Sequence, residues 1–255
     1  MVSMGWLITG GLVASRLSGA MMVMPAIGLQ GVPGLVRILC AIALTGVIAP
    51  IVPQNTELLT VTHLVAAMSS EVLLGLIMGG ALRLIFGAMA LSARIMSMQM
   101  GHGAAMFFDP VSQGTIGPLG ALASFLAMGV FLGLNIHLEF LYALSQSFYQ
   151  VPPGQVTSPI AAGSIWIQVV GMVIEAGFRL ATPVLCLTFL INTFVAVITK
   201  LSPSMNVFFA LGMILTVIGG HMVLYVSMPH LVAQHVALIR SVMDLMPEIL
   251  RLAGG

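Results

Sequence analysis

Hydrophobic residues occupy long blocks of this 255-residue chain, and short clusters of proline, glycine and polar residues separate the blocks. A helix that crosses a bilayer needs about 20 predominantly apolar residues. Several blocks are longer than this, so the pattern predicts an all-α, polytopic membrane protein built from long apolar helices. The predicted helical segments are Gly5–Leu29, Leu35–Ile51, Val61–Gln99, Leu119–Phe148, Ile165–Thr199 and Val207–Met228.

The pattern changes after Pro229. Apolar residues there recur in steps of four and three, which places them in a narrow stripe along one side of a helix. Two interpretations remain open: a helix that docks on partner helices or on a membrane surface, and a final helix that packs on its own chain. The stripe consists of Val232, Val236, Ile239, Met243, Met246 and Leu250.

The first predicted loop covers residues 99–118 and contains four glycines, two prolines and the pair Phe107–Phe108. Methionines are frequent at its start, and methionine is a flexible side chain that fills irregular gaps. Beside two phenylalanines they could form a deformable apolar plug. Composition alone favours ordinary core packing, because methionine is plentiful throughout the chain. The methionines concerned are Met96, Met98, Met100 and Met106.

The second predicted loop, Lys200–Asn206, is a short polar turn between two long apolar segments. Its serines and Pro203 are typical of the end of one helix and the start of the next. We therefore expect an antiparallel helical hairpin made of Ile165–Thr199 and the segment from Val207 onward. Pro183 predicts a kink within the first of these helices.

Composition supports membrane insertion and excludes several classes of protein. Hydrophobic residues make up 59% of the chain and charged residues 6%, whereas soluble domains carry about 25% charged residues. A soluble monomer with so few charges could not cover its surface, so lipid or partner subunits must cover this one. The chain has no basic run, and we expect no nucleic-acid partner.

Several charged residues lie inside the predicted helices, where a charge at mid-bilayer costs at least about 2–3 kcal/mol. We expect them to face a bundle interior, water or a partner. Glu175 and Arg179 are spaced to pair on one helical face. Arg83 and Arg94 share a face with no acid between them, and Arg94 could instead reach the membrane surface. The residues singled out are Arg16, Glu71, Arg83, Arg94, Glu139, Glu175 and Arg179.

No set of reactive groups typical of an enzyme is present. The six histidines lack metal-site spacing, and there is no phosphate-binding glycine loop and no dinucleotide fingerprint. We therefore expect no catalytic residue, no metal and no cofactor. Two alternatives stay open: a small secondary transporter or channel with Arg83, Glu139 or Glu175 in a polar pathway, and an intramembrane protease using Ser164 and His221.

The run MQMGHGAAMFFDP, Met98–Pro110, resembles the corresponding loop of the FliR/SctT family, which forms part of the export gate of type III secretion systems. Ile136 and the run Ile214–Thr216 depart from the family pattern. Further similarity extends in order over nearly the whole chain. It comprises Arg16 with Gly19, Pro25, Gly28, Val32, Pro33 and Arg37; Gly133–His137; and Lys200–Phe208 followed by Leu211 and Gly212.

The resemblance implies a helical subunit that assembles in a spiral with homologues of FliP and FliQ around a pore for unfolded export substrates. Homologues of FlhB and FlhA would associate with it, in the lipid of the bacterial inner membrane at the flagellar basal body. Residues 1–155 would be FliP-like and residues 160–255 a FliQ-like hairpin with an amphipathic tail. The run SPSMNVFF, Ser202–Phe209, favours the flagellar branch over the virulence branch.

The resemblance also implies roles for the two loops. The first, at about residues 98–118, would close the pore and move aside for substrate, and an apolar constriction blocks ions by dewetting. Its expected residues are Met98, Met100, Met106, Phe107, Phe108, Asp109 and Pro110. The second loop would be the turn between the two helices of the hairpin, formed by Lys200, Pro203, Met205 and Asn206.

Overall fold

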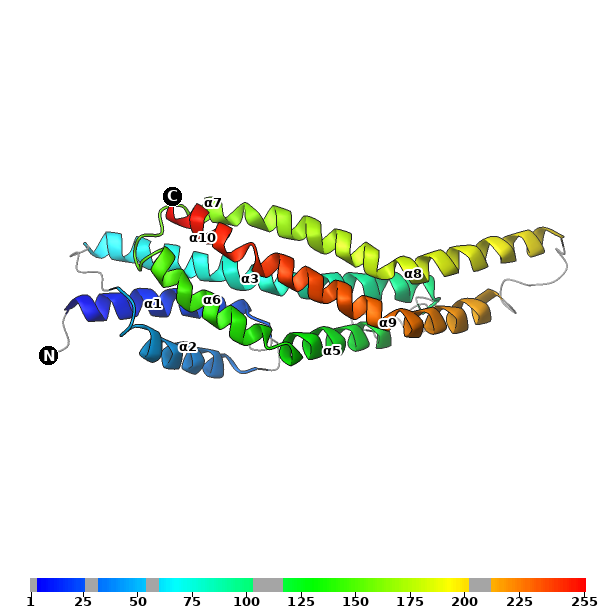
Figure 1. Ribbon diagram of the computed structural model, residues 1–255, viewed down its shortest axis with the longest axis horizontal. Helices are drawn as coiled ribbons and strands as arrows, with labels where there is room; N and C mark the ends of the chain where they lie inside the picture. The colour runs from blue at the N-terminus through cyan, green and yellow to red at the C-terminus, as the bar shows by residue number, and fades with distance from the viewer. Residues whose placement is uncertain (1–3, 26–31, 54–59, 103–116, 202–211) are drawn as a thin grey trace. The chain divides into compact units, whose positions relative to one another are not determined.

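The computed structural model describes residues 4–25, 32–53, 60–102, 117–201 and 212–255, and these ranges contain helices and no strand (Figure 1). The all-α prediction is therefore confirmed. The helices are α1 (Met4–Val23), α2 (Gly34–Ile48), α3 (Val61–Gln99), α5 (Pro118–Gly133), α6 (Ile136–Gln150), α7 (Pro159–Gly163), α8 (Ile165–Leu201), α9 (Met213–Met243) and α10 (Met246–Gly254).

Four of the described helical segments are long and apolar enough to cross a membrane, and α5 with α6 would make a fifth, bent span. At a rise of about 1.5 Å per residue, the 39 residues of α3 extend about 58 Å. The hydrocarbon layer is only about 30 Å thick. The prediction of a polytopic membrane protein is confirmed. The four segments are Met4–Val23, Val61–Gln99, Pro159–Leu201 and Met213–Gly254.

The predicted fourth helix is divided into two. Asn135 has a left-handed backbone with φ of 57°, and the axes of α5 and α6 differ by 60°. Asparagine tolerates this conformation better than most residues, which explains why the break falls here. A continuous helix from Leu119 to Phe148 was therefore a wrong prediction, because one residue's backbone ends the helix without interrupting the apolar composition.

Both internal prolines are accommodated within helices. Pro183 lies inside α8, and Pro229 lies inside α9. The helix therefore continues through Pro229, although the residues that follow Pro229 are more polar than those before it. A proline removes one intrahelical hydrogen bond, but a long helix with many other contacts tolerates that loss.

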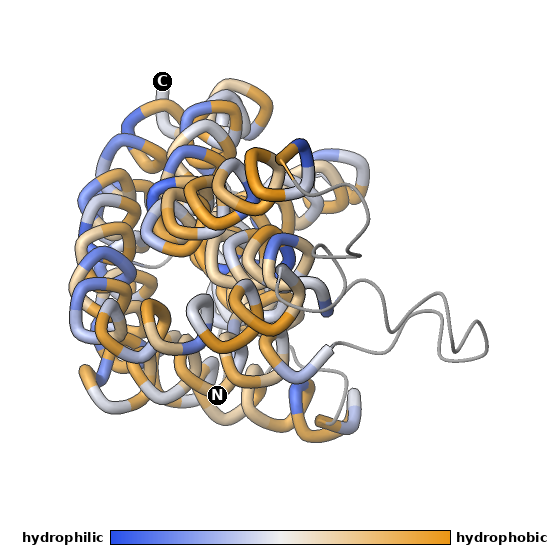
Figure 2. Tube along the Cα trace, turned by 90° about the vertical axis from the view of Figure 1, so that its right-hand side faces the viewer, coloured by the Kyte–Doolittle hydropathy of each residue, from blue (hydrophilic) through white to orange (hydrophobic). Residues whose placement is uncertain are grey.

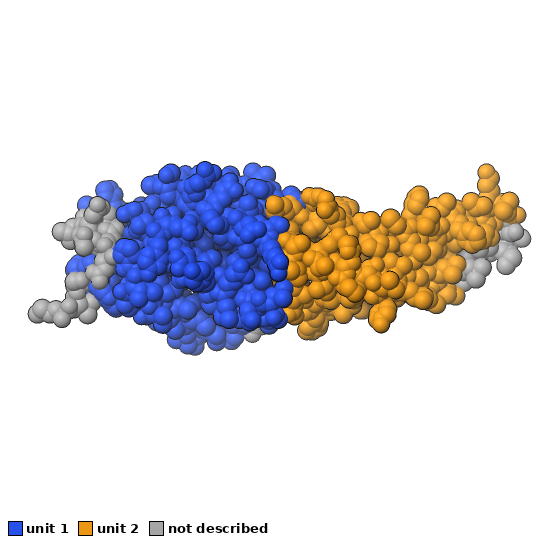
Figure 3. All heavy atoms as spheres, in the orientation of Figure 1, with its two compact units in different colours: residues 1–85, 131–171, 239–255 blue, residues 86–130, 172–238 orange. Residues whose placement is uncertain are grey.

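The described chain forms two units by its internal contacts, coloured separately in Figure 3. Unit 1 comprises Met1–Ile85, Phe131–Gly171 and Ile239–Gly255, and unit 2 comprises Phe86–Val130 and Met172–Leu238. Each unit draws on both halves of the sequence. The division into residues 1–155 and 160–255 concerns likeness to FliP and FliQ, and it stays a prediction.

The C-terminal helix packs on its own chain within unit 1. Helix α10 contacts α6 and α7, and the Ala253 carbonyl accepts the backbone N–H groups of Thr157 and Ser158 at 3.0 and 3.2 Å. The structure thus favours the second of the two interpretations of the apolar stripe, for its α10 portion. The buried residues of α10 are Met246, Ile249, Leu250 and Ala253.

Large apolar side chains also lie on the outside of the helices, and hydrophobic residues colour most helical turns in Figure 2. Helix α2 exposes Leu35, Leu39 and Ile42, and α8 exposes Ile167 and Phe189. Contiguous apolar surface of this kind requires lipid or protein to cover it.

Candidate functional site

A buried ion pair joins two helices of unit 1. Arg16 of α1 donates from Nε to Glu71 Oε2 of α3 at 2.5 Å, and from Nη2 to Oε1 at 3.1 Å. Both side chains are fully buried. This two-point geometry is the strong form of a carboxylate–guanidinium contact. The expectation that these two charges face a bundle interior is confirmed.

Helix α6 and the segment after it complete the site. Arg16 Nη1 donates to Ser147 Oγ, and Nη2 donates to the Val151 carbonyl, each at 2.9 Å. The Arg16 guanidinium carbon lies 4.3 Å from the centre of the Phe148 ring, within range of a cation–π contact. The Gly154 N–H donates to Glu71 Oε1 at 2.8 Å. We call these residues the buried ion-pair cluster.

The cluster satisfies nearly all of the hydrogen-bonding capacity of its arginine. A guanidinium has five N–H donors, and four of those of Arg16 have acceptors here. A buried charge without such partners would be strongly destabilising. The cluster therefore holds α1, α3 and α6 in one arrangement. Its groups are enclosed within the unit, so it stabilises the fold and offers no surface to a substrate.

Glycines allow α1 and α3 to approach closely beside the cluster. A Cβ added to Gly19 would collide with the Val72 carbonyl, and one added to Gly75 would collide with the Arg16 carbonyl. Only glycine fits at such backbone contacts. Sequence reasoning singled out Arg16, Gly19 and Glu71 but did not pair Arg16 with Glu71. No local signal could have revealed this pairing, because the two residues lie 55 positions apart in the chain.

A second ion pair lies in unit 2, on the exposed side of α8. Arg179 Nη2 is 2.6 Å from Glu175 Oε1, and the side chains are 68% and 62% exposed, respectively. The predicted pairing of these residues is confirmed. Unlike the buried cluster, this pair points out of the chain.

The other three charges singled out from the sequence, Arg83, Arg94 and Glu139, are also exposed. None of them has an ion-pair partner among the described residues. They are therefore free to meet lipid head groups, water or a neighbouring subunit.

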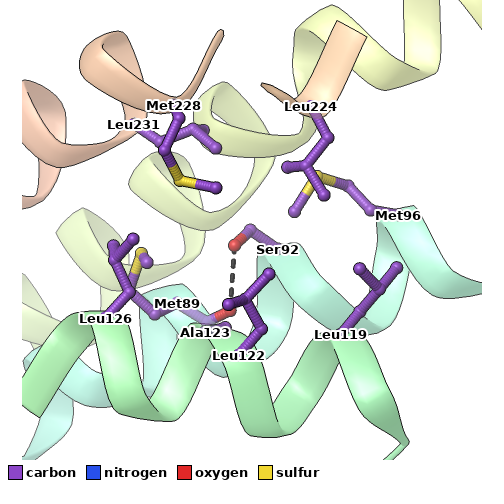
Figure 4. Close-up of a pocket in the computed structure, with 10 residues that line it drawn as sticks. All are labelled: Met89, Ser92, Met96, Leu119, Leu122, Ala123, Leu126, Leu224, Met228 and Leu231. Atoms are coloured by element: carbon purple, nitrogen blue, oxygen red, sulfur yellow. Dashed lines mark hydrogen bonds between the residues drawn. The ribbon is translucent and has the colours of Figure 1, made fainter. Parts of the chain in front are cut away.

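A small cavity in unit 2 lies between α3, α5 and α9, and Figure 4 shows the side chains around it. Its lining is apolar apart from Ser92, whose hydroxyl donates to the Met89 carbonyl at 2.9 Å. No charged side chain lines it, so it is not a polar pathway for an ion. The described residues also contain no group of three or more potential metal ligands.

The start of the predicted gate loop is anchored to α9. Met98 is 69% exposed, whereas Met100 is fully buried, and a Cβ added to Gly220 would meet the Met100 side chain. Met100 therefore does not project from the loop as expected, because its thioether occupies the space that Gly220 leaves on α9. The expected loop residues Met106, Phe107, Phe108, Asp109 and Pro110 lie outside the described residues.

Two histidines also meet where the end of α3 contacts α9, next in sequence to the contact of Met100 with Gly220. The rings of His102 and His221 are 5.2 Å apart between centroids and nearly perpendicular. The Nδ1–H of His221 donates to the Val217 carbonyl at 2.8 Å. Burial, and secondarily the charge of His221, lower the pKa of His102 below its ordinary value. The pair therefore favours the uncharged form of His102.

The predicted hairpin turn is described only at its start. Lys200 is exposed in the last turn of α8, where a positive charge interacts favourably with the helix dipole. The remaining turn residues Pro203, Met205 and Asn206 lie outside the described residues.

Comparisons with known proteins agree with the resemblance found in the sequence. The family model described as "Bacterial export proteins, family 1" matches residues 7–242. The chain is 26% identical to the flagellar biosynthetic protein FliR of Caulobacter vibrioides, over 82% of this chain and 84% of that protein. It is 26% identical to FliR of Pectobacterium carotovorum (89% and 86%) and 24% identical to FliR of Escherichia coli K12 (89% and 86%). The chain therefore belongs to bacterial export protein family 1, the FliR/SctT family, and is a membrane component of the flagellar export apparatus.

Proposed function

We propose that the chain is a FliR-type export gate subunit that helps to form a pore for unfolded protein substrates and carries out no covalent chemistry. In this proposal it lies in the bacterial inner membrane, in the flagellar basal body, and assembles with homologues of FliP and FliQ. Homologues of FlhA and FlhB form the export machinery around it. The family match over residues 7–242 is the observation that carries the proposal.

The uncovered surface of the helices supports assembly with other subunits. In Pro159–Leu201, only 22% of an apolar stretch of 18 residues is buried within the chain. In Val61–Gln99, 56% of the corresponding stretch is buried. Long apolar helices with so little internal contact need other helices or lipid beside them. Several are also longer than a bilayer requires.

The proposed seal of the idle pore is the loop that follows α3. Its apolar residues Met106, Phe107 and Phe108 would exclude ions by dewetting, and flexible methionine would repack around a passing chain. Met100 takes a different role in this proposal. Because it packs against Gly220, it fixes the base of the loop on α9 while the rest of the loop moves.

A small secondary transporter or channel has less support. Such a protein would require Arg83, Glu139 or Glu175 to line a polar pathway. All three side chains are exposed, and the cavity described in unit 2 is apolar.

Co-purification tests the assembly. The tagged chain, produced with its FliP and FliQ homologues in a mild detergent, should copurify with both, and it should aggregate when produced alone. A monodisperse, folded monomer that binds neither homologue would overturn the proposal.

Conductance tests the seal. The variant F107A/F108A should assemble normally and raise ion leakage across the membrane. F189A, on exposed α8, is a control for the loss of a large apolar side chain and should leave leakage unchanged. Normal assembly of F107A/F108A without added leakage would refute the seal and leave the assembly proposal standing.

A further inference from the structure

The described residues bring two imidazole rings into contact at one place only, where the chain leaves α3 beside α9 within unit 2. The ring centres of His102 and His221 are 5.2 Å apart, and the ring planes are inclined by 80°. The other histidine rings with a described ring contact lie against phenylalanine, as His235 does against Phe86. Phenylalanine supplies no ligand atom, whereas two imidazoles side by side offer two ring nitrogens to one ion.

The spacing of the two rings fits a shared metal ion. Zn²⁺ binds imidazole nitrogen at about 2.0–2.1 Å and prefers tetrahedral geometry, which places the centres of two coordinated rings about 5 Å apart. The observed separation of 5.2 Å agrees with this value. The steep angle between the rings is also compatible, because coordination fixes the direction of each metal–nitrogen bond and leaves the ring free to turn about it.

His221 is already oriented as a metal ligand. Its Nδ1–H donates to the Val217 carbonyl at 2.8 Å, which leaves a lone pair on Nε2 of the neutral ring. Metal-bound histidines almost always have their second ring nitrogen held in this way. The side chain is exposed, so an ion can reach it from outside the chain.

His102 is the half of the pair with unmet hydrogen-bonding capacity. The residue is half-buried, and its Nδ1 is buried and has no hydrogen-bond partner among the described residues. Buried polar atoms normally have a partner. Burial also lowers the pKa of His102, and a metal ion binds the uncharged imidazole. The protein thus holds His102 in the form that a metal ion requires.

We propose that His102 and His221 form a binding site for a divalent transition metal ion of the zinc type, with water in the remaining coordination positions. Zinc and its neighbours suit imidazole ligands, whereas Mg²⁺ and Ca²⁺ require oxygen. Two protein ligands are fewer than the three or four of a permanent zinc centre, so the ion binds reversibly. While bound, it connects the end of α3 to α9.

Spacing along the sequence does not reveal this site, because its two ligands come from different parts of the chain and only the fold brings them together. The inference depends neither on the pore nor on the seal. It can therefore fail while the proposed function stands, and co-purification tests that function separately.

A titration with Zn²⁺ tests the site. The full chain, purified in mild detergent with the subunits that copurify and with a tag free of histidine, is stripped of metal by a chelator and titrated by calorimetry. Loss of a group that only orients a metal ligand lowers metal affinity about 10–100-fold, so H102Q and H221Q should each weaken one zinc site at least about tenfold. H63Q, at an exposed histidine of α3, is the matched control and should leave zinc binding unchanged.

Hydrogen exchange of the same samples reports where the ion binds. At a Zn²⁺ concentration that fills the site of the parent, the backbone around His102 and His221 should gain protection in the parent and in H63Q. It should gain little in H102Q or H221Q. The double variant H102Q/H221Q should lose no more zinc than either single variant, since both residues hold one ion. A parent that binds no Zn²⁺, or single variants that keep the zinc affinity and protection of H63Q, would overturn the inference.

Discussion

Removing the Glu71 charge should destabilise unit 1 more than any surface substitution. The variant E71Q keeps the size of the side chain and leaves the guanidinium of Arg16 buried without a counter-charge. Breaking a buried ion pair from one side costs about 3–5 kcal/mol. At about 1.4 kcal/mol per factor of ten, this lowers the folding equilibrium constant by about two to three and a half orders of magnitude.

The structure supports a value within this range. Arg16 is fully buried and keeps its contacts with Ser147, the Val151 carbonyl and the Phe148 ring when Glu71 becomes neutral. These contacts solvate the charge in part but do not neutralise it. The glycine contacts between α1 and α3 also prevent the helices from moving apart to admit water without loss of packing.

Unfolding of the purified complex by sodium dodecyl sulfate measures the effect, with E71Q, R16M and the double variant R16M/E71M compared with the parent. Each single variant should unfold at a lower detergent fraction. The double variant should recover much of the loss, because it leaves no unpaired charge. E248Q, at an exposed pair, is the control and should change little. Single variants that lose less than about 1 kcal/mol would refute the reasoning.

Three further outcomes follow from the structure. Below about pH 6.5 the unfolded state binds a proton at His102 more readily than the folded state. The backbone around His102, at the end of α3, should therefore lose protection in hydrogen exchange as pH falls, and H102Q should remove that dependence. G75V should prevent the close approach of α1 and α3 and abolish recovery of folded chain, whereas G46A, at an open position, should not. Inserting two residues in the turn Lys200–Asn206 should impair complex assembly on a native gel, and normal assembly and export would show that the turn is only a tether.

Local features of this chain were predictable from its sequence. The apolar blocks identified the long helices, because burial and membrane insertion both depend on composition over about 20 residues. The pairing of Glu175 with Arg179 was also predictable, since helix geometry alone brings residues four apart together. The family resemblance was visible in short motifs, and the family match confirms it.

Backbone details were less predictable. The helix break at Asn135 depends on one left-handed residue within a continuous apolar block, and apolar composition does not reveal it. At Pro229 the sequence misled in the other direction. Proline often ends a helix, and the predicted segment ended at Met228, but α9 continues through Pro229. Neighbouring contacts, which the pattern does not contain, decide whether a helix tolerates such a residue.

Only the tertiary structure decided which distant residues meet. Glu71 pairs with Arg16, which the sequence did not indicate. Met100, which we expected to face the pore, packs against Gly220 instead. Each contact joins segments far apart in the chain and requires a glycine that lets two backbones or a side chain approach. Helix periodicity determines which side of a helix a residue occupies, but the partner on that side depends on how whole helices pack, and this is a property of the folded chain.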